Sequence, residues 1–288
     1  MVLVKYDKEN NKWNIIDEKE KDNECLYLDG KLKEKLDSIK KILKDNWDCF
    51  FMIDGMEGSG KSTLGMTCAW YLSNTNFSVA NICKSGKEAI EKLSSFKEES
   101  VLIIDEGDLS FSSRDVFNNE QKLLINLTKV IRFRRLILII IAPTFFDLTK
   151  GISVRRSKFL LHVYTDKQLH RGRFAYFGAR KKQMLYEMGK KSYGSYAKPK
   201  SDFIGRFTDF QFLPDYHEAK AETVELMLVN DKEKSRYKLQ RDFLMEELKK
   251  RKLMTYEEME KVFKRCELPI GKRQIAREIV KNRINGYG

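Results

Sequence analysis

The chain of 288 residues contains few cysteines, and none of them are spaced as metal ligands. The five lie far apart, at Cys25, Cys49, Cys68, Cys83 and Cys266. Because no two of them form a Cys-x-x-Cys pair, we expect no zinc site. The odd count and wide spacing also argue against a disulfide framework, and they favour a reducing, intracellular setting.

Long hydrophobic runs are also missing. The longest, residues 136–143, is far shorter than the roughly 20 residues that a membrane-spanning helix needs. Residues 1–6 lead straight into charged sequence and do not resemble a signal peptide. The sequence therefore indicates no intrinsic membrane anchor. It predicts a cytoplasmic protein, or one in the host cytoplasm, associated with virion assembly, if the chain is viral.

Acidic residues are scarce in one segment of an otherwise highly charged chain. Residues 151–200 hold 13 Lys and Arg against only Asp166 and Glu187, a net charge of +11. Residues 1–150 carry a net charge of −1, and residues 151–288 carry +14. This asymmetry predicts a polyanion-binding surface, with DNA as the favoured partner. The alternative is an ordinary solvated, lysine-rich surface.

Six arginines in about fifty residues favour nucleic acid over that alternative, because a generally lysine-rich surface does not explain a concentration of arginine. They are Arg155, Arg156, Arg171, Arg173, Arg180 and Arg206. Aromatic residues are interleaved with them. Phe174, Tyr176 and Phe177 are interpreted cautiously as strand core. For Tyr193 and Tyr196 the sequence leaves open whether they stack on bases or pack inside the protein.

A phosphate-binding loop is the strongest motif in the chain. Residues 55–63 fit the pattern G-x-x-x-x-G-K-[ST], after an apolar strand at 50–53 and before a helix at 63–72. Backbone N–H groups of such a loop surround phosphates, the lysine reaches the β- and γ-phosphates, and the following hydroxyl holds Mg²⁺. The predicted ATP-binding residues are Gly55, Glu57, Gly58, Ser59, Gly60, Lys61, Ser62 and Thr63.

The rest of the pattern predicts an α/β fold, a P-loop NTPase three-layer sandwich with a mostly parallel central sheet. Further strands are expected at 77–83, 101–104 and 136–142, alternating with helices at 31–46, 85–93 and 116–131. Two more strands are expected at 158–165 and 173–177, followed by an irregular connection at 190–206. We divide the chain into an N-terminal β-hairpin at 1–30, an ATPase domain at 31–215 and a basic helical region at 216–288.

Two carboxylates end the strand at 101–104. Asp105 is placed to bind Mg²⁺ together with Ser62, and Glu106 to act on the attacking water. Solvated acids at an ordinary strand end would look similar, but the nearby P-loop favours the catalytic interpretation. A glutamate here indicates hydrolysis rather than transfer to a bound acceptor. Lys61, Asp105 and Glu106 are therefore the predicted catalytic core.

An arginine that contacts the γ-phosphate could complete the site, from the same or a neighbouring subunit. Arg155 and Arg156 are the main candidates, with DNA contact as an equal alternative. For Arg132, Arg134 and Arg135, cations favoured at a helix C-terminus are the simpler explanation. Thr144 lies where such enzymes keep a polar sensor, although a turn residue is at least as good an interpretation.

The order of these motifs is the P-loop at 55–63, Asp105 and Glu106, Arg132 before an apolar strand, and then Arg155 and Arg156. In this order the chain resembles the additional-strand, catalytic-glutamate P-loop ATPases. Within them it is most similar to the FtsK–HerA and zonula-occludens-toxin-like DNA-pumping ATPases of viruses and mobile elements. The resemblance covers roughly residues 45–165, and at residues 142–146 the chain lacks the glutamine usual in that group. It implies ATP and Mg²⁺ as cofactors, a homo-oligomer such as a hexamer, and DNA, single- or double-stranded, as the track.

Three functions follow, in order of preference. The first is an ATP-hydrolysing DNA translocase, for example a genome-packaging or DNA-transfer ATPase of a virus or mobile element. The second is an ATPase switch or assembly factor that acts on protein partners and carries its basic charge incidentally. The third is a small-molecule phosphotransferase, which the Asp105–Glu106 pair disfavours.

Overall fold

A computed structural model describes residues 1–105, 114–192, 194–213, 216, 241, 243–245, 247–251 and 253–265. The chain divides into two compact units, Met1–Pro214 and Asp215–Gly288. Among the described residues, no helix combines the length and the apolar character that crossing a membrane requires.

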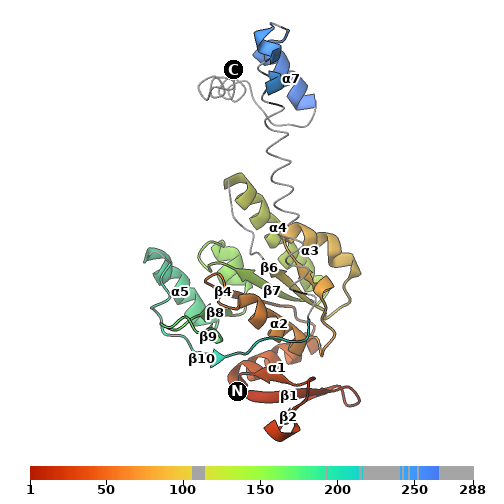
Figure 1. Cartoon of the computed structure of the whole chain (residues 1–288), viewed down its shortest axis with the longest axis vertical. Coiled ribbons are helices and arrows are strands. Elements are labelled where there is room, and N and C mark those ends of the chain that lie inside the picture. The colour runs from red at the N-terminus through yellow and green to blue at the C-terminus, as the bar shows by residue number, and fades with distance from the viewer. Residues whose placement is uncertain are drawn as a thin grey trace. The chain divides into compact units, whose positions relative to one another are not determined.

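A seven-stranded sheet forms the centre of the first unit (Figure 1). Its order is β10-β9-β8-β4-β7-β6-β5, and the five strands from β8 to β5 are parallel. The antiparallel strands β9 and β10 extend one edge. The strands are β4 (Cys49–Gly55), β5 (Ile82–Cys83), β6 (Val101–Asp105), β7 (Ile137–Ala142), β8 (Leu160–Tyr164), β9 (Arg173–Phe177) and β10 (Phe203–Arg206). The predicted α/β class with a mostly parallel sheet is thus confirmed.

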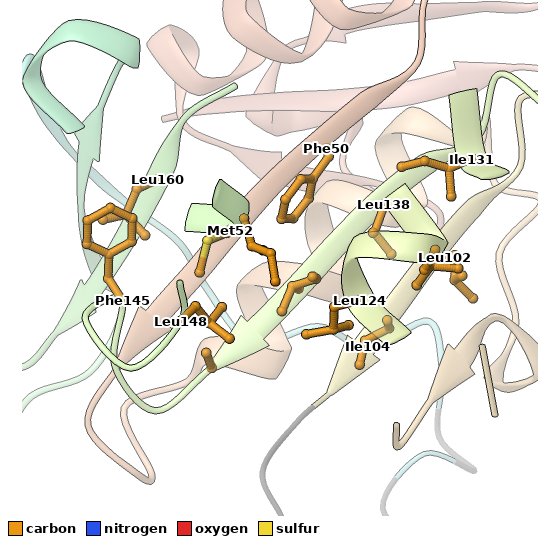
Figure 2. Close-up of a cluster of buried hydrophobic side chains, with 14 of the residues drawn as sticks. Phe50, Met52, Leu102, Ile104, Leu124, Ile131, Leu138, Phe145, Leu148 and Leu160 are labelled. Carbon is orange, nitrogen blue, oxygen red and sulfur yellow. The ribbon is translucent and has the colours of Figure 1, made fainter. Parts of the chain in front are cut away.

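The two central strands, β4 and β7, are buried along their whole length, because helices cover both faces of the sheet. On one face, α4 (Arg114–Phe133) and α3 (Gly86–Lys92) pack against Phe50, Leu102 and Leu138 (Figure 2). On the other, α2 (Lys61–Leu72) lies so close that a Cβ atom on Gly65 would meet Ile141 Cδ1 at 2.8 Å. Alternate residues of each strand supply the two faces.

The second predicted strand is much shorter than expected. Residues 77–83 were expected to be extended throughout, but a 3₁₀ turn at Val79–Asn81 leaves only β5 as strand. The Ser78 backbone N–H donates to Asn81 Oδ1, and the Asn81 side chain donates to the Val101 carbonyl. These side-chain bonds compete with the backbone ladder at this edge of the sheet and shorten the strand.

The stretch after β9 is more regular than the sequence predicted. A helix, α5 (Ala179–Lys191), was not foreseen, and β10 adds a strand inside the region expected to be irregular at 190–206. Phe174, Tyr176 and Phe177 are buried, so the core interpretation of these aromatics is confirmed. Strands β8 and β9 appear where the sequence placed them.

The N-terminal strands β1 (Val2–Asp7) and β2 (Lys12–Ile16) pair antiparallel, and β3 (Leu26–Leu28) adds a third strand beside β1. Helix α1 (Gly30–Lys44) follows, where a helix was predicted at 31–46, and its buried residues are Leu32, Leu36, Ile39 and Leu43. Trp13 of β2 packs on Tyr71 of α2, and its indole N–H donates to the Tyr71 carbonyl at 3.0 Å. These strands therefore belong to the same compact unit as the central sheet.

The described part of the second unit contains α7 (Tyr256–Arg265). A capping box opens this helix, because Thr255 N donates to the Glu258 carboxylate at 2.6 Å and Glu258 N donates to Thr255 Oγ1 at 3.3 Å. Met245 and Met259 are buried together in a small apolar cluster. Residues 266–288 of the predicted basic helical region lie outside the described residues.

Candidate nucleotide site

The loop between β4 and α2 has a backbone that requires glycine. Gly55, Gly58 and Gly60 have φ angles of 143°, 72° and 100°. Residues with a Cβ atom rarely adopt such angles. A Cβ atom on Gly55 would also lie 2.1 Å from the Val163 carbonyl oxygen of β8. The glycines of the motif are therefore dictated by the local backbone and by the neighbouring strand.

Lys61 and the loop are in direct contact. Its ammonium group donates to the carbonyl oxygens of Gly55 at 2.7 Å and Met56 at 3.0 Å. Glu57 and Gly58 are exposed, whereas Ser59 is buried and, within the described part of the chain, its hydroxyl has no hydrogen-bond partner. Thr63 lies in the first turn of α2, one residue beyond Ser62. The loop thus gathers one cation, a hydroxyl and a helix N-terminus at one point.

Ser62 and Asp105 meet although they are far apart in the sequence. The Ser62 hydroxyl donates to the Asp105 carboxylate at 2.8 Å. Asp105 ends β6, and β7 lies between β6 and the loop-bearing strand β4. A hydroxyl and a carboxylate side by side are oxygen ligands of the kind that Mg²⁺ takes. These two oxygen donors are therefore compatible with the Mg²⁺ that the sequence predicts.

The predicted water-activating residue, Glu106, lies outside the described residues. Arg155 is exposed in the π-helical turn Gly151–Arg156. Arg156 donates to the Thr128 carbonyl and approaches the Asp48 carboxylate at 3.6 Å. Asp48 precedes β4, so Arg156 lies at the amino edge of the parallel strands. The phosphate loop follows the carboxyl edge, and Arg156 therefore does not face the loop of its own chain.

The arginines before β7 hold neighbouring loops in place. Arg134 donates to the carbonyls of Leu93 at 2.6 Å and Phe96 at 3.1 Å. Arg135 pairs with Glu98 and donates to Asn46 Oδ1 at 2.7 Å. These contacts indicate that both residues have a structural role at the amino edge of the sheet. Arg132 is exposed in the last turn of α4.

A polar cluster beside the phosphate loop was not identified from the sequence. Asp54, the residue before Gly55, is fully buried and accepts hydrogen bonds from Phe145 N at 2.8 Å and from the Tyr196 hydroxyl. His162 Nδ1 lies 2.9 Å from its other oxygen, Oδ1. In the sequence, the one feature that could have pointed to this cluster is an aspartate at the end of an otherwise apolar strand. Its partner Tyr196 is 142 residues away, a separation that no local pattern spans.

Two side chains from two distant segments also lie against the loop. Phe207 follows β10, and its ring would meet a Cβ atom on Gly60 at 3.1 Å. Arg171 lies in the connection between β8 and β9. One of its guanidinium nitrogens would lie 3.7 Å from a Cβ atom on Gly58. Further along, Phe212 stacks on Trp70 of α2 with ring centroids 4.9 Å apart. Residues 207–212 thus run along the helix that leaves the loop.

The basic residues around α5 divide into buried, paired and exposed groups. Lys182 is fully buried and donates to the Ser157 hydroxyl at 2.5 Å, and burial lowers the pKa of its ammonium group to about 7. Arg173 pairs with Asp166 at 3.3 Å, and Lys181 with Asp202 at 3.2 Å. The exposed cations are Arg180, Lys190, Lys191, Lys198 and Lys200.

Taken together, the sheet order and the strand–glycine loop–helix unit define an α/β domain of the P-loop kind. No protein-family model matches the chain. No curated protein matches it either. Among solved structures, it is similar to the replication initiator DnaA bound to AMPPCP and single-stranded DNA, at 14% identity and a TM-score of 0.33. That alignment covers 60% of this chain and 55% of that chain, little more than half of its length.

Proposed function

We propose that this protein binds ATP with Mg²⁺ and hydrolyses it to move DNA. The observation that carries the ATPase part is the hydrogen bond of 2.8 Å between Ser62 and Asp105, beside a loop whose three glycines have positive φ. Glycine loops alone are common, whereas a loop-helix hydroxyl and a strand-end carboxylate in contact are what a nucleotide-bound metal needs.

In this proposal each residue has a defined task. The loop N–H groups, Lys61 and the buried Ser59 hydroxyl bind phosphate oxygens, while Ser62 and Asp105 hold Mg²⁺. When bound, Mg²⁺ neutralises charge that develops on the phosphoryl oxygens. Glu106, next in the chain after Asp105, orients the attacking water and accepts its proton.

DNA is proposed as the partner because five exposed cations lie on or beside α5: Arg180, Lys190, Lys191, Lys198 and Lys200. The only acidic residues between 151 and 200 are Asp166 and Glu187. Cations in such numbers release counterions when they bind phosphates, which gives affinity without base specificity. A translocase needs that kind of contact, because it must hold every sequence it passes. The finer role, DNA packaging or transfer for a virus or mobile element, comes from the sequence resemblance.

The test is the ATPase rate of the full chain with no DNA, with single-stranded DNA and with duplex DNA, each at 50 and 200 mM salt. Lys61→Ala should greatly weaken nucleotide binding, and Glu106→Gln should bind ATP while its hydrolysis collapses. Lys41→Ala, at an exposed position on α1, is the matched lysine control. Normal hydrolysis by Glu106→Gln would remove that residue from the mechanism.

The salt series tests the DNA part separately. If about six phosphates are contacted, the DNA affinity should fall about 10³-fold between 50 and 200 mM salt. ATP hydrolysis without any salt-sensitive DNA binding would favour the second candidate, a switch that acts on protein partners. One observation supports that candidate: α5 exposes Met184 and Met188, one helical turn apart, and methionine suits adaptable protein contacts.

A further inference from the structure

Tyr196 connects two parts of the first unit. One is the basic segment, which carries Lys190, Lys191, Lys198 and Lys200, and the other is the edge of the sheet that bears the phosphate loop. Tyr196 lies between α5 and β10, two residues before the exposed Lys198. Its hydroxyl donates to the carboxylate of Asp54, the residue that precedes the phosphate loop.

The same hydroxyl also contacts the connection after β7. Phe145 N donates to it at 3.2 Å, and Thr144 Oγ1 lies 3.4 Å away. The neighbouring Pro143 carbonyl accepts a hydrogen bond from Gly55 N at 3.4 Å. Tyr196 therefore contacts the end of β4, which leads into the phosphate loop, and the connection that follows the neighbouring strand β7. Thr144 also caps its own turn, since Phe146 N donates to its hydroxyl at 3.3 Å.

The ring of Tyr196 is held on two sides. It stacks on His162, with centroids 3.6 Å apart and planes 12° apart, and it meets Phe146 edge to face at 5.1 Å. Phe146 in turn packs on α5, where a Cβ atom on Gly189 would lie only 2.4 Å from its ring. Burial and the Asp54 charge raise the pKa of the Tyr196 hydroxyl, which keeps it a donor at neutral pH.

These contacts form a tight path from the end of α5, through Phe146 and Tyr196, to Asp54. Closely packed groups transmit displacement because they have no space to absorb it. A polyanion that binds Lys190, Lys191, Lys198 and Lys200 would act on the segment that carries Tyr196.

We propose that Tyr196 is the positioning residue through which DNA bound to the basic segment controls the ATP site. The proposal rests on the ATPase and DNA binding proposed above, and it adds the route between them. Tyr196 itself touches neither nucleotide nor DNA. It sets the position of Asp54 and Thr144, and through them the start of the phosphate loop and the neighbouring strand end.

The test compares Tyr196→Phe with the wild type in the full chain. The variant keeps the ring stack and loses only the hydroxyl. The readout is the stimulation factor, the ATPase rate with saturating duplex or single-stranded DNA divided by the rate without it. We expect this factor to fall about fivefold or more, because coupling between sites is typically worth 5–150-fold. The DNA dissociation constant should stay that of the wild type.

Tyr186→Phe is the matched control. Tyr186 belongs to the same aromatic group, but its hydroxyl contacts the Leu148 carbonyl at 3.4 Å and the Lys190 ammonium group at 3.3 Å, and it does not contact Asp54. Because Lys190 is one of the cations proposed to bind DNA, the DNA dissociation constant of this variant is measured as well. This variant should keep the wild-type stimulation factor. If thermal melting shows that Tyr196→Phe is unfolded, because the buried Asp54 has lost one of its hydrogen-bond donors, the double variant Asp54→Asn/Tyr196→Phe is compared with Asp54→Asn alone.

Three outcomes would overturn the proposal. One is a Tyr196→Phe protein stimulated like the wild type, and another is an equal loss of stimulation in Tyr186→Phe. The third is a wild-type ATPase that DNA does not stimulate, which leaves nothing to couple. A wild-type chain without any ATPase activity would instead contradict the proposed function itself, so the two failures are distinguishable.

Discussion

Ser62 and Asp105 are 43 residues apart and share one hydrogen bond. Each comes from the end of a different element: Ser62 from the first turn of α2 and Asp105 from the last position of β6. Parallel strands bring such ends to one edge of the sheet, which is why the sequence could predict their meeting. The Asp54 cluster is different, because its partners His162 and Tyr196 follow Asp54 by 108 and 142 residues and carry no motif.

At this scale the sharpest prediction concerns the metal ligands. Asp105→Asn keeps the shape of the side chain and removes the charge that would bind Mg²⁺. The ATPase rate should fall about 10²-fold or more, since the metal supplies several kcal/mol of charge stabilisation. The Mg²⁺ concentration for half-maximal rate should rise as well. A Mg²⁺ titration of the ATPase rate measures both, and an unchanged midpoint would assign the metal to other ligands.

Most elements of the sheet could be predicted because their sequences are simple. Residues 137–142 are apolar at every position, as a central strand covered on both faces requires. Helix α5 was missed because its buried face includes Lys182 and Gly189, which interrupt the apolar period that marks a helix. Strand β10 was missed because its four residues include Gly205, under which the Phe174 ring packs.

Lys182 also predicts how stability depends on pH. Its pKa is lowered from 10.5 to about 7 by burial in the folded state, while the unfolded chain keeps the ordinary value. Between these two values the unfolded state binds the additional proton, so the folded state gains stability as the pH rises. The gain is at most about 1.4 kcal/mol per pH unit, and it is lost again as the pH falls towards 7.

Lys182→Met should remove this contribution. Chemical denaturation at pH 7 and pH 9 should show a smaller rise in the free energy of unfolding for the variant than for the wild type. Lys181→Met is the control, because Lys181 is partly exposed and paired with Asp202. Equal rises in Lys182→Met and the wild type would show that Lys182 keeps its proton in the folded protein up to pH 9, and hence that its pKa is not lowered to about 7.

At the scale of the whole molecule, an arginine is still needed to complete the proposed ATP site. Arg156 lies at the amino edge of the sheet, bonded to Thr128 and close to Asp48, and is therefore occupied within its own chain. Arg155 is exposed on the same turn. If the protein forms the oligomer that the sequence resemblance implies, Arg155 is available to a neighbouring subunit.

Mixing two inactive variants tests this assignment. Arg155→Ala should lower the ATPase rate about 10³-fold while ATP still binds, as expected for an arginine that acts in the transition state. Mixed with Lys61→Ala, it should regain activity, because a mixed interface pairs an intact loop with an intact arginine. Activity that does not recover on mixing would exclude an arginine supplied by the neighbouring subunit.

The packing of α2 has a practical consequence. Trp70 lies on this helix against Phe212, and Trp13 donates its indole N–H to the carbonyl of Tyr71, the next residue. Of the three tryptophans of the chain, Trp70 thus belongs to the helix that begins at the phosphate loop, and Trp13 of β2 is hydrogen-bonded to it. Their fluorescence emission provides a label-free optical signal for nucleotide binding, and substituting Trp47 would leave only these two reporters.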